Sequence, residues 1–207
     1  MSNEKKKIRS PVSREQAESY LLTSLMAFAA TVILTRVYLE MAGYPQLGNS
    51  VLHIAHALWG GLLLFVAVLL PLAFANRWAL WGSALLGGMG IGLFIDEVGK
   101  FITQSNDYFF PPALSIVYGF FLLTFTVYLL FRRPQRQGPR CALYHVLDRL
   151  QDAVDGDLDA AEAARIESQL TVAKQSDLRE AVALVEALSD FLQAEGQYLA
   201  AARPGFG

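Results

Sequence analysis

Charged residues are scarce in this chain, and four long stretches contain almost none. Asp, Glu, Lys and Arg make up 17% of the 207 residues, and the mean hydropathy is +0.34. A soluble domain carries about 25% charged residues, and a helix needs about 20 apolar residues to cross a bilayer. Four successive runs reach about that length, which excludes an ordinary soluble domain and predicts an all-α, four-helix transmembrane bundle. The predicted spans are 20–42, 50–76, 79–103 and 112–131.

Cysteine and the common catalytic motifs are also scarce. The only cysteine is Cys141, so no disulfide forms within the chain and cysteine usage does not indicate the compartment. The sequence has no G-x-S-x-G elbow, P-loop or dinucleotide-binding fingerprint. The glycines at 87–92 lie inside a predicted span, where helix packing explains them. The sequence therefore predicts no catalytic residue and leaves open whether the protein is an enzyme.

Lysine and arginine are missing from two of the predicted loops. Residues 43–49 and 104–111 contain none, whereas residues 1–19, 76–78 and 132–140 all carry them. Positive residues favour the cytoplasmic side, so both termini are predicted to lie in the cytoplasm. The basic residues adjoin the spans without interleaved aromatics, which indicates contact with the lipid bilayer and no nucleic-acid-binding surface.

Composition changes along the chain predict its domains. The region after the last span becomes amphipathic, as in soluble helices, and it is expected to pack on itself or to bind a second copy or another protein. The predicted regions are a cytoplasmic basic arm at 1–19, the transmembrane domain at 20–131, a basic linker at 132–140, a helical cytoplasmic tail at 141–200 and a disordered end at 201–207.

Two patterns define helices within the tail. Asp159 and Glu162 have the spacing of a capping box, which predicts the start of a helix. The helix before it is expected to carry a single apolar stripe, which packs on the other tail helices or on another copy. That stripe consists of Leu143, Val146, Leu147, Leu150 and Val154.

The few ionisable residues inside the spans lie at similar depths near the outward side. At about 1.5 Å of rise per residue, those on three spans are all within about 10 Å of the outer ends. Charges inside a membrane are costly unless partners meet them, so these spans are expected to bring the side chains together. The residues are Arg36 and Glu40 on the first span, His53 and His56 on the second, and Asp96, Glu97 and Lys100 on the third.

Three interpretations of this cluster remain open. Two histidines and carboxylates suit a transition metal such as zinc or iron. A proton or ion relay is the second interpretation, because histidine titrates near neutral pH. A structural ion-pair network is the third, in which case the tail would carry the function by binding a protein partner. The predicted metal ligands are His53, His56, Asp96 and Glu97, and the supporting polar network is Arg36, Glu40, Lys100 and Asp107.

The second and third spans carry motifs that resemble a group of bacterial four-span integral membrane proteins. The motifs are LHIAHALWGG, GLFIDEVGKFIT and NDYFFPPA, with the patterns H-x-x-H and F-x-D-E-x-G-K-F at their centre. The resemblance covers about residues 20–131. It implies the four-span fold and a bacterial membrane, and it implies no activity, cofactor or substrate.

Reporter fusions test the predicted topology. Green fluorescent protein fused after Gly207 should fluoresce, and alkaline phosphatase fused there should be inactive, because the tail is expected in the cytoplasm. Alkaline phosphatase inserted within 104–111 should be active. The reverse pattern at either point would contradict the predicted orientation.

Overall fold

The described part of the chain is helical and falls into two compact units. The computed structural model describes residues 10–43, 56–104, 107, 110–133, 138–155, 158–176 and 179–201. All regular structure in these ranges is α-helix, which confirms the predicted fold class. The membrane unit is Gln16–Pro134, and the C-terminal unit combines Met1–Glu15 with Gln135–Gly207.

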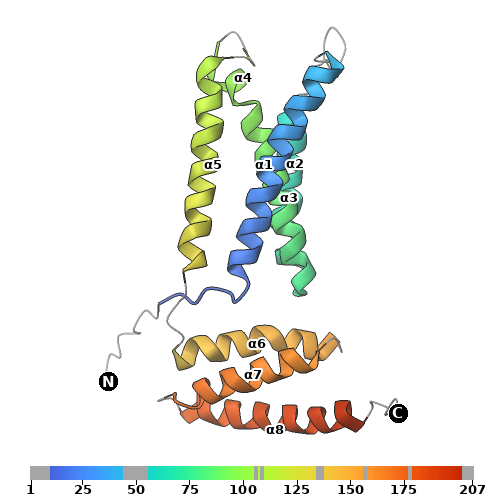
Figure 1. Cartoon of the computed structure of the whole chain (residues 1–207), viewed down its shortest axis with the longest axis vertical. Helices are drawn as coiled ribbons and strands as arrows, with labels where there is room; N and C mark the ends of the chain where they lie inside the picture. The colour runs from blue at the N-terminus through green and yellow to red at the C-terminus, as the bar shows by residue number, and fades with distance from the viewer. Residues whose placement is uncertain are drawn as a thin grey trace, which may run out of the picture. The chain divides into compact units, whose positions relative to one another are not determined.

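Four helices of the membrane unit are long and apolar enough to cross a bilayer, so the protein is a multi-pass membrane protein. Helix α3 contacts both α1 and α2 along much of its length, whereas α5 contacts chiefly α1 (Figure 1). The bundle is therefore centred on α3. The four helices are α1 (Ala17–Ala42), α2 (His56–Ala73), α3 (Arg77–Asp96) and α5 (Pro111–Arg132).

Glycines allow α3 to approach α1 and α2 at close range. A Cβ atom on Gly88 would lie 2.2 Å from the Ser24 carbonyl oxygen of α1. On the opposite side of α3, a Cβ on Gly90 would lie 2.8 Å from the carbonyl oxygen of Gly60 in α2. Lipid is as apolar as the helix surfaces, so no hydrophobic effect drives helices together in a membrane. Small residues at the contacts favour association instead, because they let the backbones pack closely. These contacts hold α1 and α2 closely against α3.

The third span is not the continuous helix over 79–103 that the sequence predicts. Helix α3 ends at Asp96, Glu97 takes backbone angles φ −91° and ψ 8°, and a short helix α4 follows at Val98–Ile102. In an unbroken helix, neighbouring side chains point about 100° apart. The interruption lets both Asp96 and Glu97 turn their carboxylates inward, and both are fully buried.

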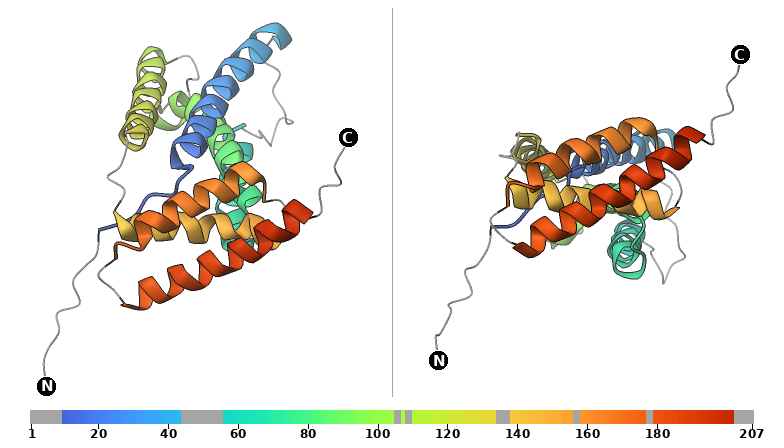
Figure 2. Two further views of the ribbon diagram at one scale, coloured as in Figure 1. Left: turned by 60° about the horizontal axis from the view of Figure 1, so that its bottom comes forward. Right: turned by 90° about the horizontal axis from the view of Figure 1, so that it is seen from below.

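The C-terminal unit contains three helices, α6 (Pro139–Asp155), α7 (Ala160–Ala173) and α8 (Arg179–Ala201), which run alongside one another (Figure 2). Its core includes Val146, Ile166 and Val185. The capping box at the start of α7 is confirmed, because the Glu162 amide donates to Asp159 and the Asp159 amide donates to Glu162. Helix α7 thus begins where the sequence predicts.

The apolar stripe predicted for α6 is divided between two faces. Val146 is fully buried, and Leu143 and Leu150 pack against the core. In contrast, Leu147 is 44% exposed and Val154 is 87% exposed, so the stripe does not pack as a whole within the unit. The core contacts of α6 are centred on Ala142 and Val146. Leu147 and Val154 lie on the side of the helix that points away from those contacts.

Residues 10–15 belong with the C-terminal unit, where they pack against α6. Arg149 is almost fully buried and donates two hydrogen bonds to the Glu15 carboxylate, at 2.5 Å and 2.6 Å. Arg14 pairs with Asp148 at 2.8 Å. A bidentate arginine–carboxylate pair is among the stronger polar contacts in proteins, so the arm is held firmly.

The close contact at Gly88 predicts a specific sensitivity to substitution. Gly88→Ala should destabilise the protein by about 1–3 kcal/mol, since the new methyl group forces the backbones of α1 and α3 apart. Unfolding of the purified protein in detergent would measure the change. The matched control is Gly61→Ala, where a Cβ meets nothing within 4 Å. Equal stability of the two variants would contradict this packing.

Candidate functional site

Two adjacent carboxylates form the centre of the site. Asp96 is the last residue of α3, Glu97 follows it, and neither is exposed to solvent. Burying an ionised carboxylate is costly unless it is paired and hydrogen-bonded. The elements around the end of α3 are therefore expected to direct donors at these two groups.

Hydrogen-bond donors from three helices contact the two carboxylates. Arg36 on α1 donates from Nε to Asp96 Oδ1 at 2.5 Å. Lys100 on α4 donates from Nζ to Glu97 Oε1. The backbone amide of Ala57, in the first turn of α2, donates to Glu97 Oε2 at 2.8 Å. The two carboxylates thus connect α1, α2 and α4 at the end of α3.

His56 lies between the two carboxylates. Its Nε2 atom is 3.4 Å from Asp96 Oδ2, and its Nδ1 atom is 3.7 Å from Glu97 Oε2. Both distances exceed the usual 2.7–3.2 Å of an N–H···O hydrogen bond. The imidazole is therefore oriented toward both acids without a tight hydrogen bond to either of them.

The charges of the cluster balance when His56 is neutral. Arg36 and Lys100 contribute two positive charges, and Asp96 and Glu97 contribute two negative charges. Solvent exposure is uneven, because the side chains of Arg36, His56 and Lys100 are 32%, 21% and 25% exposed while the carboxylates are fully buried. The accessible groups of the cluster are thus its basic groups.

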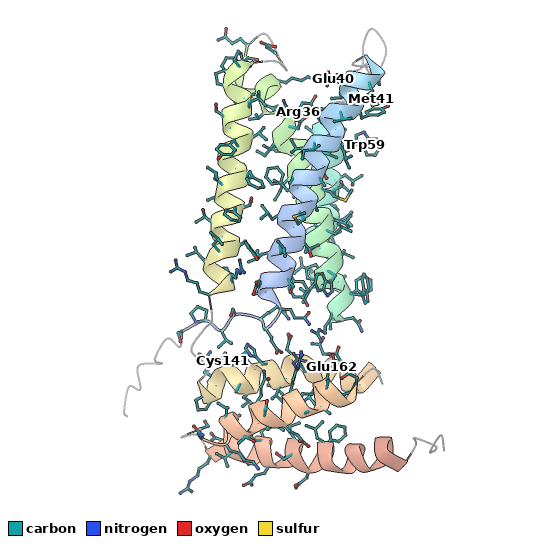
Figure 3. The ribbon with its side chains drawn as sticks, viewed as in Figure 1. Arg36, Glu40, Met41, Trp59, Cys141 and Glu162 are labelled. Atoms are coloured by element: carbon teal, nitrogen blue, oxygen red, sulfur yellow. The ribbon has the colours of Figure 1, made fainter. Side chains whose placement is uncertain are left out.

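The structure brings together most, but not all, of the residues predicted for this site. Arg36 and Glu40 lie near the same end of α1 (Figure 3), yet Glu40 is exposed and makes no ion pair with any described residue. The backbone amide of Asp107 donates to the Thr103 hydroxyl at 2.7 Å, after α4. His53 lies outside the described residues. The prediction that it joins His56 therefore remains a prediction.

A metal site is not complete among the residues that the structure describes. No group of three or more histidine, cysteine, aspartate or glutamate side chains in those ranges is arranged to hold a metal ion. Since one of the four predicted ligands, His53, is outside them, the metal interpretation is still a hypothesis.

The Ala57 amide is the part of the site that the sequence analysis did not anticipate. Side-chain patterns carry no information about which buried carboxylate a backbone N–H will meet. A general signal was available, because the first amides of a helix have no partner within the helix and favour negative charge. Glu97 uses one of these amides.

Another histidine and the single cysteine lie together in the C-terminal unit. Cys141 Sγ is 3.6 Å from His145 Nε2, which also lies 3.2 Å from the Ser13 carbonyl oxygen. Burial raises the pKa of the Cys141 thiol, and the nearby Arg140 charge opposes that shift. A protonated thiol is a poor nucleophile and metal ligand, so this pair is not a second candidate site.

Comparison of the chain with protein-family models, with curated proteins and with solved structures gives no match. Any functional proposal must therefore rest on the geometry of the cluster.

Removing Arg36 should destabilise the membrane unit. Arg36→Met leaves the Asp96 carboxylate buried without its closest cation, which costs about 3–5 kcal/mol for a fully buried pair. A value near the lower limit is expected because Arg36 is partly exposed. Unfolding in detergent measures the change, and the double variant Arg36→Met/Asp96→Asn should recover much of the loss.

The control for this experiment is Glu40→Gln, one helical turn away on α1. Glu40 is exposed, so its substitution should alter stability by about 0.5 kcal/mol or less. If Arg36→Met were as harmless as the control, the contact between Arg36 and Asp96 would not hold α1 against α3.

Proposed function

We propose that the chain is a bacterial inner-membrane protein that binds a transition-metal cation, zinc or iron, at the outward end of the α1–α3 bundle. His56 and Asp96 are the central ligands. The observation that carries the proposal is the separation of 3.4 Å between His56 Nε2 and Asp96 Oδ2. The zinc–nitrogen and zinc–oxygen distances of about 2.0–2.2 Å put two ligands of a tetrahedral site about 3.4 Å apart. The observed pair has this separation.

Glu97 has a different role in this proposal from the ligand role that the sequence suggests. Its carboxylate is occupied by Lys100 and by the Ala57 amide, and it faces the other ring nitrogen of His56 at 3.7 Å. Histidine ligands of metals commonly direct their second nitrogen at a carboxylate, which orients the ring. Glu97 is therefore proposed as the group that positions His56.

The remaining ligands are proposed from the sequence. His53 precedes His56 by three residues and is proposed as a further ligand from this H-x-x-H pattern. Water would complete a four-coordinate site. Arg36 occupies the other oxygen of Asp96, so the carboxylate would offer one oxygen to the metal.

A structural network is the main rival to this proposal. Two positive and two negative side chains already balance, and such a network can hold helices in register without binding anything. A proton or ion relay is less well supported, because the sequence provides no comparable charged groups in the inner halves of the spans.

Metal analysis of the detergent-purified protein separates these possibilities. The wild type, loaded with cobalt as a spectroscopic substitute for zinc, should bind a single ion per chain and show the visible bands of a four-coordinate site. His56→Ala and Asp96→Asn should lose the ion. Glu97→Gln should keep the site with about 10–100-fold weaker affinity, since outer carboxylates usually contribute that much.

The matched control is His145→Ala, which removes a histidine from the C-terminal unit and should leave metal binding unchanged. Negligible cobalt binding by a folded wild type would overturn the proposal. So would equal binding by the wild type and His56→Ala. Either result would favour the structural network.

A further inference from the structure

Helix α6 has an exposed face that is apolar. Tyr144, Leu147 and Val154 are 53%, 44% and 87% exposed, and they are the exposed side chains in the described part of α6. A helix that covers the surface of a soluble unit normally turns polar side chains outward. The composition of this face thus indicates a partner.

The three exposed apolar side chains share one side of α6 with the basic residue Arg140 and the polar residue Gln151. With 3.6 residues per turn, Arg140, Tyr144, Leu147 and Val154 fall within an arc of about 80°. The Arg140 guanidinium lies 5.3 Å from the centre of the Tyr144 ring, and it also donates to the Ser10 carbonyl oxygen at 2.6 Å. We call Arg140, Tyr144, Leu147 and Val154 the α6 face.

The rest of α6 is occupied within its own unit. Ala142 and Val146 belong to the core with α7 and α8. Arg149 holds Glu15 of the arm, and the nearby acidic residue Asp148 is paired with Arg14. The α6 face therefore has no part in the core.

Short connections join α6 to two of the candidate membrane helices. Helix α5 ends at Arg132 and α6 begins at Pro139, so the connection between them extends at most about 25 Å at about 3.5 Å per residue. Glu15, which Arg149 holds, is two residues before the start of α1 at Ala17. The sequence over 132–140 has four arginines and no acidic residue.

We propose that the α6 face docks on the anionic headgroup region of the lipid bilayer. Tyrosine and arginine suit this region because each has an apolar body and a polar end. Basic residues beside a span are attracted to anionic lipids, and amphipathic helices bury their apolar side at the headgroup boundary. A stable protein interface needs about 800 Å² per partner, which three partly exposed side chains cannot supply.

Site-specific fluorescence quenching tests this proposal in the full-length protein. In a Cys141→Ala background, Leu147→Cys is labelled with a small fluorophore and the protein is placed in lipid nanodiscs. Lipids that carry a quencher in the headgroup region should quench the label severalfold more than they quench a label at Leu184→Cys. Leu184 is the matched control, since it is an apolar residue of α8 with 40% exposure. A water-soluble quencher should show the reverse preference.

The lipid composition supplies a second measurement. Quenching at position 147 by the labelled lipids should be stronger in nanodiscs that contain phosphatidylglycerol than in phosphatidylcholine alone, and Arg140→Gln should reduce that difference. Equal quenching of labels 147 and 184 by lipid would overturn the proposal. Protection of label 147 from both quenchers, with energy transfer between labelled copies, would also overturn it, because a second copy would then cover the face.

Discussion

Two carboxylates that are fully buried inside a membrane unit are the constraint on which the rest of its structure depends. An unpaired charge in that environment is costly, so each acid must be met by donors. Asp96 is met by Arg36 from α1, and Glu97 is met by Lys100 from α4 and by the first turn of α2. Because apolar side chains gain little by leaving lipid for one another, these polar contacts and the close glycine packing are what select one arrangement of helices.

The depth of the ionisable residues was enough to predict the centre of this cluster. Counting residues from the ends of the spans places Arg36, His56 and Asp96 at similar heights, and the structure brings these three together. The same count places Glu40 near the boundary, where water can solvate it, and the structure leaves it exposed. Depth predicts which charges must find a partner more reliably than it predicts which partner they find.

Other features depended on backbone geometry that periodicity does not reveal. The break at Glu97 follows from the need to turn two consecutive carboxylates inward, and an apolar run of suitable length gives no sign of it. In the C-terminal unit, the heptad-like spacing of α6 does not distinguish Val146, which is buried, from Leu147, which is exposed. The contact of Glu15 with Arg149 joins residues 134 positions apart, beyond the reach of any local pattern.

The contact between Glu15 and Arg149 also has a consequence for biosynthesis. Glu15 is translated 134 residues before its partner, and every predicted span lies between the two. The C-terminal unit can therefore be completed only after the last span has left the ribosome, and only if the N-terminal arm has stayed on the side where Arg149 emerges. A chain whose first helix inserted in reverse would leave the buried Arg149 without its carboxylate.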